Sequence, residues 1–242
     1  PINLGYLSGY LKNKGHEVRI LDFGLRKDVG ILTNTLKDFE PHVVGINVFT
    51  PNVLDGFELV KIVKSVNSKY VTIMGGPHST SIPEATLEAC HDLDFIVIGE
   101  GEATLLELCD KLEKKNDISQ VAGLCYRQNG KITRTMPRPL IAELDSLPFP
   151  DRDSIIQYYQ KLTVFDHNLG LSLSNVLELI TSRGCTAFCT FCTVHRAFTE
   201  KTRSLRLRSA DNVLKEIDLF KSKYDIKHVS FLDDSFTINR ER

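Results

Sequence analysis

Three cysteines within eight residues constrain this chain more than any other feature of its sequence. Cys185, Cys189 and Cys192 follow the spacing C-x3-C-x2-C, directly after a strand-like run at 176–180. A loop of this length can wrap three thiolates around one face of an iron–sulfur cube. Such clusters usually have four thiolate ligands, and no fourth cysteine lies near these three in the sequence. The spacing therefore predicts a [4Fe–4S] cluster with one iron open to a small molecule.

Two other interpretations of the cysteine motif stay open. A structural zinc site needs four nitrogen or sulfur ligands, and His195, three residues after Cys192, is a possible fourth ligand. A disulfide would require an oxidising compartment. The remaining cysteines, Cys90, Cys109 and Cys125, are scattered singly, and a buried free thiol is the usual state of such residues. We therefore favour the cluster over zinc and over a disulfide.

The composition is that of an ordinary globular protein. The chain of 242 residues is 42% hydrophobic and 25% charged, with a formal net charge of −1, so no overall field attracts nucleic acid or an anionic membrane. No apolar run approaches the roughly 18 residues that a membrane span needs. We expect a cytoplasmic protein without a membrane span. The basic side chains from Arg196 to Arg208 indicate a solvated surface rather than a nucleic-acid site.

The first half of the chain alternates short apolar runs with amphipathic segments. Strand-like runs lie at 18–21, 43–49, 71–74 and 95–98, and helix-like segments lie at 4–11, 30–39, 53–66, 83–89 and 103–115. This alternation predicts βαβ units around a parallel sheet. Because no strand precedes the first helix-like segment, we expect the chain to begin inside a βαβ unit.

The second half contains a hairpin, a connector and a new α/β pattern. A turn at Asn129-Gly130 predicts a β-hairpin at 121–135, and four prolines between 136 and 170 mark a connector. A strand, the cysteine loop, a helix at 210–223 and a strand at 228–232 then open a β/α barrel, which is far from the roughly eight strands of a complete one. We expect three parts, at 1–138, 139–172 and 173–242, and a truncated chain that is poorly soluble, partly unfolded after 170 and inactive alone.

Three strand ends in the first half carry loops of a similar kind. Sheets of this type bind ligands outside the carboxyl ends of their strands, and paired glycines let the backbone approach a large flat ligand. The residues concerned are Thr50, Gly75, Gly76, His78, Gly99, Glu100 and Gly101. Each loop by itself is equally consistent with a tight turn between a strand and a helix.

The cysteine motif resembles that of the radical S-adenosylmethionine (SAM) superfamily. The chain as a whole resembles the branch with an N-terminal cobalamin-binding domain, through residues 4–18, 75–78, 99–102 and 144–150. The resemblance implies a doubly wound, Rossmann-like α/β domain followed by the first βα units of a partial, TIM-like β/α barrel. It also implies a [4Fe–4S] cluster, SAM and cobalamin as cofactors. No D-x-H-x-x-G motif is present, so we expect no histidine of the chain below cobalt.

The same resemblance implies roles for individual residues. Cys185, Cys189 and Cys192 would hold the cluster, whose open iron chelates SAM, and Phe191 would lie beside the SAM adenine. A carboxylate of Asp233 or Asp234 would bind the SAM amino group, unless both aspartates cap a helix near Asn239. The cobalamin site would be lined by Thr50, Gly75, Gly76, His78, Gly99, Glu100 and Gly101.

These implications describe an enzyme that reductively cleaves SAM to a 5′-deoxyadenosyl radical and methylates carbon in a small molecule. Its electrons would come from a donor such as flavodoxin or ferredoxin. A cyclase or rearrangement enzyme with a vestigial cobalamin domain is one alternative, and a zinc-stapled binding module that is not an enzyme is another. No catalytic residue, substrate or oligomeric state is assignable from the sequence.

Overall fold

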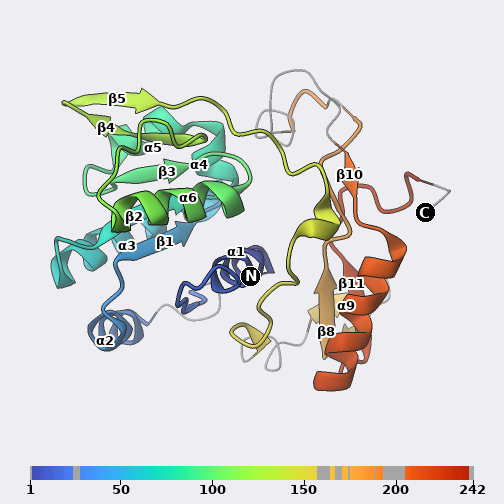
Figure 1. Cartoon of the computed structure of the whole chain (residues 1–242). Helices are drawn as coiled ribbons and strands as arrows, with labels where there is room; N and C mark the ends of the chain where they lie inside the picture. The colour runs from blue at the N-terminus through green and yellow to red at the C-terminus, as the bar shows by residue number, and fades with distance from the viewer. Residues whose placement is uncertain are drawn as a thin grey trace. The chain divides into compact units, whose positions relative to one another are not determined.

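The computed structural model describes residues 2–23, 28–156, 164–166, 171–173, 175–187, 189–192 and 205–239 (Figure 1). The chain forms two compact units. One unit combines Pro1–Arg26, Ile141–Ala187 and Arg203–Arg242, and the other combines Lys27–Leu140 and Phe188–Thr202. The three-part division expected from the sequence stays a prediction. No helix in the described part of the chain is both long enough and apolar enough to cross a membrane.

The Lys27–Leu140 unit contains a five-stranded sheet with the order β1-β2-β3-β4-β5. The strands are β1 (Val43–Asn47), β2 (Val71–Gly75), β3 (Phe95–Val97), β4 (Leu124–Gln128) and β5 (Lys131–Arg134). The first three are parallel, and the last two form an antiparallel hairpin. Asn129 and Gly130 both have positive φ in its turn, as the Asn-Gly signal predicts.

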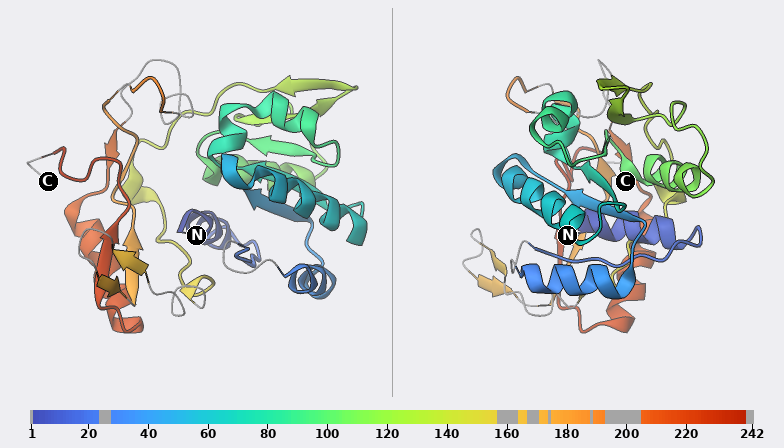
Figure 2. Two further views of the ribbon diagram at one scale, coloured as in Figure 1. Left: turned by 180° about the vertical axis from the view of Figure 1, so that it is seen from behind. Right: turned by 90° about the vertical axis from the view of Figure 1, so that its left-hand side faces the viewer.

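Helices connect the strands and cover both faces of this sheet (Figures 1 and 2). They are α2 (Val29–Phe39), the 3-10 helix η1 (Thr50–Asn52), α3 (Val53–Val66), α4 (Pro77–Ser81), α5 (Pro83–Ala89) and α6 (Gly101–Glu113). Adjacent residues of β2 belong to different apolar clusters, because successive side chains of a strand point to opposite faces. Met74 packs with Val60 of α3 and Leu87 of α5, whereas Ile73 packs with Leu108 of α6. The α/β class with a mainly parallel sheet is confirmed.

The prediction of a strand at 18–21 is wrong. These residues have no regular structure and pair with no strand in the described part of the chain. Alternating apolar residues make a segment suitable for a sheet, but a strand exists only where a neighbour completes its hydrogen-bond ladder. At 43–49 the strand is shorter than expected and ends at Asn47, because a 3-10 helix follows from Thr50.

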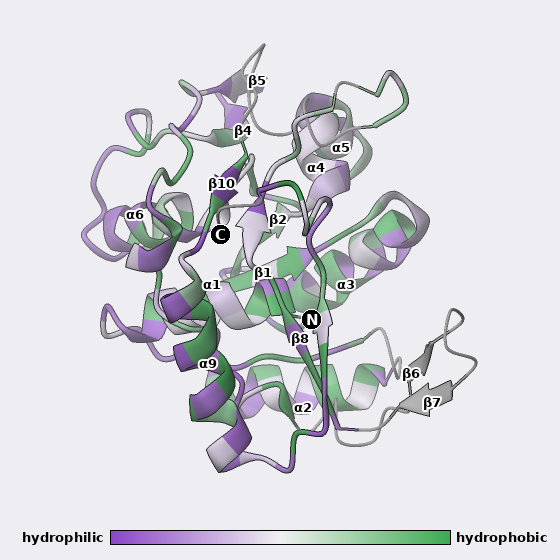
Figure 3. Cartoon of the chain, turned by 90° about the vertical axis from the view of Figure 1, so that its right-hand side faces the viewer, coloured by the Kyte–Doolittle hydropathy of each residue, from purple (hydrophilic) through white to green (hydrophobic). Residues whose placement is uncertain are grey.

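The other unit contains a βαβ motif. Strand β8 (Val176–Leu179) pairs in parallel with β11 (His228–Phe231), and α9 (Ala210–Lys223) lies between them in sequence. Apolar side chains of α9, among them Val213 and Phe220, pack with Leu177 and Leu179 of β8, and hydrophilic residues make up much of the remaining helix (Figure 3). The described strands form no closed barrel, which is consistent with a partial one.

Smaller elements complete this unit. They are α1 (Ile2–Lys12), the 3-10 helix η2 (Leu144–Ser146) and the strand pairs β6 (Val164–Asp166) with β7 (Leu171–Leu173) and β9 (Ser182–Arg183) with β10 (Arg206–Leu207). The pair β6–β7 lies in the segment expected to be an irregular connector.

Helix α1 packs closely against the segment that follows Pro148. A Cβ on Gly9 would lie 2.6 Å from the carbonyl oxygen of Phe149, and the backbone N–H of Asp151 donates to the carbonyl of Gly5 at 2.8 Å. The Asp151 carboxylate accepts hydrogen bonds from Ser8 at 2.6 Å and from Lys12 at 2.7 Å. Two of the stretches that carry the family resemblance, 4–18 and 144–150, are therefore in direct contact.

Candidate functional site

The cysteine loop follows β8 after a two-residue strand, β9, and a turn at Gly184. Thr181 and Ser182 are buried, Ser182 and Arg183 form β9, and Gly184 has a φ of 88°. A positive φ is readily adopted only by glycine, so Gly184 turns the chain immediately before Cys185. The strand and the turn together fix where the loop starts.

The loop presents three free thiols. Cys185 and Cys192 are half-buried and Cys189 is exposed. The backbone N–H of Cys192 donates to the carbonyl of Cys189 at 3.0 Å, and the N–H of Ala187 donates to Cys185 Sγ at 3.5 Å. Among the described residues, no three His, Cys, Asp or Glu side chains are arranged to hold a metal ion. His195 lies outside the described residues. The spacing of the three thiols fits a cluster with one open iron, but the described residues do not gather them into a metal-binding group, so the cluster stays a prediction.

Two aspartates follow β11 and differ in their surroundings. Asp233 is half-buried, and its carboxylate accepts hydrogen bonds from Thr181 N–H at 3.1 Å, from Thr181 Oγ1 at 2.9 Å and from Ser182 Oγ. Asp234 is exposed and has no partner in the part of the chain that the structure describes. The two residues that the sequence could not distinguish therefore have different surroundings. The helix expected near Asn239 lies outside the described residues.

The aromatic residue beside the last cysteine is open to solvent. Phe191 is 88% exposed, and its ring offers a free apolar face. Stacking on such a face is a common way to bind a planar base.

Buried charges support the same end of β8. Arg152 and Arg208 are each 4% exposed and Glu216 is fully buried. Nη2 of Arg152 lies 2.7 Å from Glu216 Oε1, and Nη1 of Arg208 lies 2.6 Å from Glu216 Oε2. Arg208 is thus a core residue. The prediction of a solvated surface for the basic residues from Arg196 to Arg208 is wrong at this position. The alternation Leu205-Arg206-Leu207-Arg208 is a strand signal, but it would place both arginines on the polar face, so it does not indicate that Arg208 is buried.

Tyr6 of α1 completes this buried network. Its hydroxyl accepts a hydrogen bond from Nη1 of Arg208 at 3.2 Å, and the guanidinium of Arg183 lies 5.4 Å from the centre of its ring. Burial and the negative charge of Glu216 raise the pKa of Tyr6 to about 12. No local pattern in the sequence indicates this role of Tyr6, because its partner Arg208 lies 202 residues away along the chain.

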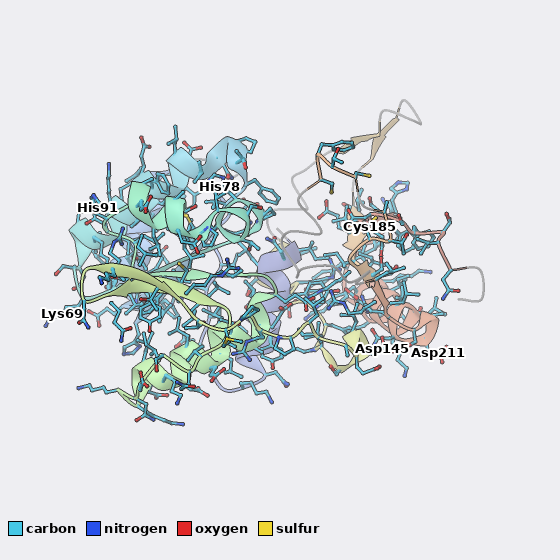
Figure 4. The ribbon with its side chains drawn as sticks, turned by 90° about the horizontal axis from the view of Figure 1, so that it is seen from above. Lys69, His78, His91, Asp145, Cys185 and Asp211 are labelled. Carbon is cyan, nitrogen blue, oxygen red and sulfur yellow. The ribbon has the colours of Figure 1, made fainter. Side chains whose placement is uncertain are left out.

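In the sheet unit, the predicted ligand loops meet at the carboxyl ends of β1 to β3. Thr50 begins η1, and its Oγ1 lies 3.1 Å from Nδ1 of His78. Thr80 of α4 accepts a hydrogen bond from the N–H of Gly99 at 3.2 Å. Burial lowers the pKa of His78. His78 lies at this edge of the sheet, while Lys69 and His91 lie at the opposite one (Figure 4). The structure thus brings Thr50 and His78 together. It also joins the loop after β2 to the loop after β3 through Thr80 and Gly99.

The glycines of these loops serve different purposes. Gly76 has a φ of 97°, and a Cβ there would lie 2.5 Å from Asn47 Oδ1 and 2.6 Å from the Val48 carbonyl oxygen. A Cβ on Gly75 would meet only the Val97 carbonyl oxygen, at 3.8 Å. Gly99 has a φ of 79°. The chain itself therefore requires glycine at 76 and favours it at 99, whereas Gly75 leaves open space that a ligand can fill.

Two further observations concern the same edge. Glu100 is the residue before α6, which begins at Gly101, so the predicted third loop leads directly into a helix N-terminus. Ser79 is fully buried, and its Oγ has no hydrogen-bond partner among the described residues. The open space at Gly75 fits a bound group at this edge.

Two protein families match the chain. The B12-binding domain matches residues 1–109, and the radical SAM superfamily matches residues 179–242. The second match includes all three cysteines of the motif and both aspartates after β11.

Curated relatives include proteins with different named activities. An uncharacterised methyltransferase of Pyrococcus horikoshii is 36% identical over all of this chain and 50% of its own length. The anaerobic magnesium-protoporphyrin IX monomethyl ester cyclase of Rubrivivax gelatinosus is 28% identical over all of this chain and 42% of its own length. The chain spans half the length of the first of these relatives and less than half of the second.

Solved structures share the fold. The cobalamin-dependent SAM radical enzyme OxsB, with aqua-cobalamin and SAM bound, superposes with a TM-score of 0.78 at 26% identity, covering 98% of this chain and 31% of its own. The radical SAM methyltransferase TsrM of Kitasatospora setae, with tryptophan and a SAM analogue bound, has a TM-score of 0.77 at 19% identity, covering 98% and 45%. The chain belongs to the branch of the radical SAM superfamily that carries an N-terminal cobalamin-binding domain.

Proposed function

We propose that this protein is a cobalamin-dependent radical SAM enzyme that transfers a methyl group to carbon in a small molecule. The observation that carries the proposal is the turn of three free thiols after β8, in a chain that also matches the B12-binding family. Several relatives are methyltransferases, including the one from Pyrococcus horikoshii. When bound, the cluster and cobalamin would supply, respectively, an electron for cleavage of SAM and a carrier for its methyl group.

The chain's own residues supply the binding groups. We assign Cys185, Cys189 and Cys192 to the cluster and the exposed ring of Phe191 to the SAM adenine. Of the two aspartates, the exposed carboxylate of Asp234 is the better candidate for the SAM ammonium group, because the carboxylate of Asp233 already accepts hydrogen bonds. An ionised acceptor strengthens a hydrogen bond from a cation.

The corrin would occupy the carboxyl ends of β1 to β3. Gly75 contributes open space, and the pair Thr50 and His78 would contribute polar contacts. Gly76, Gly99, Glu100 and Gly101 shape the loops around that space. A lone histidine is more often a hydrogen-bonding partner than a metal ligand, and Nδ1 of His78 faces the Thr50 hydroxyl, so we assign His78 no role as a cobalt ligand. Flavodoxin or ferredoxin as electron donor stays a prediction.

Anaerobic reconstitution with iron, sulfide and hydroxocobalamin tests the proposal. We expect about four irons per chain and visible absorbance from both the cluster and the corrin. Cys189→Ala should lose the cluster, while the matched control Cys109→Ala should keep it, because Cys109 lies on α6 and burial raises the pKa of its thiol to about 11. One zinc and no iron would instead support a zinc-stapled module. A cluster without bound corrin would support a vestigial cobalamin domain.

Cyclisation is the second candidate, since one relative is a cyclase. SAM labelled in its methyl group distinguishes the two reactions. Methyl transfer places the label in the product and releases S-adenosylhomocysteine, whereas cyclisation leaves the product unlabelled.

A further inference from the structure

We propose that Asp233 and Arg208 are positioning residues that clamp the junction between β8 and the cysteine loop, and that Asp233 is not a SAM ligand. The inference rests on the proposed function, because it concerns the loop that would hold the cluster. It separates two adjacent aspartates, each of which the sequence allows as the partner of SAM.

Asp233 holds the junction from one side. Its carboxylate accepts the backbone N–H of Thr181 at 3.1 and 3.2 Å, one distance to each oxygen, and the hydroxyl of Thr181 at 2.9 Å. The hydroxyl of Ser182 donates to the same oxygen, Oδ1. Hydrogen bonds to an ionised carboxylate are stronger than neutral ones. Every described donor to Asp233 thus comes from the two residues that lead into the cysteine loop.

Arg208 holds the junction from the other side. Its backbone N–H donates to the Thr181 carbonyl at 2.9 Å, and its Nη1 donates to the Ile180 carbonyl at 2.9 Å. The guanidinium is itself fixed by Glu216 and by Asn212 Oδ1, at 2.7 Å from Nε. The peptide groups of Thr181 are therefore bonded on both sides, four residues before Cys185.

This arrangement limits what Asp233 can do for SAM. Its Oδ1 already accepts from three donors, and binding SAM there would require breaking hydrogen bonds from two buried residues, Thr181 and Ser182, to an ionised carboxylate. Asp234 is exposed and makes no hydrogen bond among the described residues. Asp233 therefore holds the junction, and the carboxylate of Asp234 is available to a ligand.

Residues outside the ligand set hold metal ligands in place, and their loss typically weakens metal affinity about 10–100-fold. We therefore expect Asp233→Ala to lose iron to a chelator about 10–100-fold faster than the wild type and to change the electron paramagnetic resonance spectrum of the reduced cluster before SAM is added. Asp233→Asn keeps an acceptor oxygen for Thr181 and should restore most of the retention. The SAM affinity of the fraction that keeps its cluster should be unchanged.

The matched variant Asp234→Ala should behave in the opposite way, with normal iron retention and weakened SAM binding in a titration. Thr181→Val provides a second test that keeps the aspartate and removes one donor, and it should speed iron loss less than Asp233→Ala does. Circular dichroism and melting of each variant identify any that fails to fold.

Two results would overturn the inference. One is an Asp233→Ala protein that keeps iron and its spectrum like the wild type but binds SAM poorly, which would make Asp233 a SAM ligand. The other is normal iron retention in both Asp233→Ala and Thr181→Val. A wild-type protein that takes up no cluster would contradict the proposed function itself. This failure is seen in the wild type alone, so it cannot be confused with a failure of the clamp, which is seen only when variants are compared with the wild type.

Discussion

Arg208 and Glu216 form an ion pair of 2.6 Å between groups that are 4% and 0% exposed, and Arg152 binds the other oxygen of the same carboxylate at 2.7 Å. Two cations thus share one buried anion. Removing one partner of a buried pair leaves an uncompensated charge and costs about 3–5 kcal/mol.

Glu216→Gln should therefore lower the free energy of unfolding by about 3–5 kcal/mol, because the amide preserves the shape but leaves two buried guanidinium groups unpaired. Urea titration followed by circular dichroism measures the change. Asp218→Asn is the matched control, since Asp218 is an exposed acid on the same helix, and it should change stability by less than about 0.5 kcal/mol. Equal effects of the two substitutions would show that the triad contributes no stability.

Stability should fall at alkaline pH because of Tyr6. Its pKa is raised to about 12 in the folded protein, whereas an unfolded tyrosine titrates near pH 10. The contribution is therefore complete below pH 10 and is lost as the pH rises from 10 to 12, by about 2–3 kcal/mol at 1.36 kcal/mol per pKa unit. Melting temperatures across this range measure it. Tyr6→Phe should be less stable at neutral pH, without the Arg208 hydrogen bond, but should show a shallower alkaline decline; an identical slope would contradict the assignment.

Acid should weaken the docking of α1. Burial raises the pKa of the Asp151 carboxyl, but hydrogen bonds from Lys12, Ser154 and Ser8 outweigh burial and lower it to about 2. The stabilisation is present above the unfolded pKa near 4 and is lost as the pH falls from 4 to 2. The melting temperature should therefore fall across that window. Asp151→Asn should melt lower than the wild type already at pH 7 and show a shallower decline in acid, and unchanged melting would argue against the role of Asp151.

Local signals account for most of the fold that the sequence predicted. Helix α9 has the predicted bounds, because its apolar period and its cap, in which Ser209 Oγ accepts the N–H of Asn212, are contained within a few residues. The cysteine spacing is local in the same sense. The segment 18–21 failed as a strand because pairing depends on a distant partner, which a single segment cannot specify.

The remainder of the site depends on contacts across long stretches of chain. Asp233 lies 52 residues from Thr181, and Arg152 lies 64 residues from Glu216. No composition or period in either segment distinguishes Asp233 from Asp234, or a buried Arg208 from the basic residues before it. Their roles follow only from which groups the fold brings within hydrogen-bond distance.

The glycine pair after β2 provides the sharpest test of the cobalamin site. Gly76→Val should destabilise the protein, because its Cβ would overlap Asn47 Oδ1 and the Val48 carbonyl oxygen and its φ of 97° is strained for valine. Loss of corrin binding by that variant would therefore say nothing specific about a ligand. Gly75→Val has no such conflict, since the nearest atom to its Cβ is 3.8 Å away.

We expect Gly75→Val to melt within about 2 °C of the wild type, as surface substitutions usually do, and to lose hydroxocobalamin uptake at least about tenfold, equivalent to 1.4 kcal/mol. Corrin absorbance after gel filtration measures the uptake. Gly45→Val in β1 is the matched control, because its Cβ would meet no atom within 4 Å and the residue lies two positions before the carboxyl end of the strand. Normal uptake by Gly75→Val would remove the open space at Gly75 from the proposed cobalamin site, since a side chain there must collide with any ring that lies against the backbone.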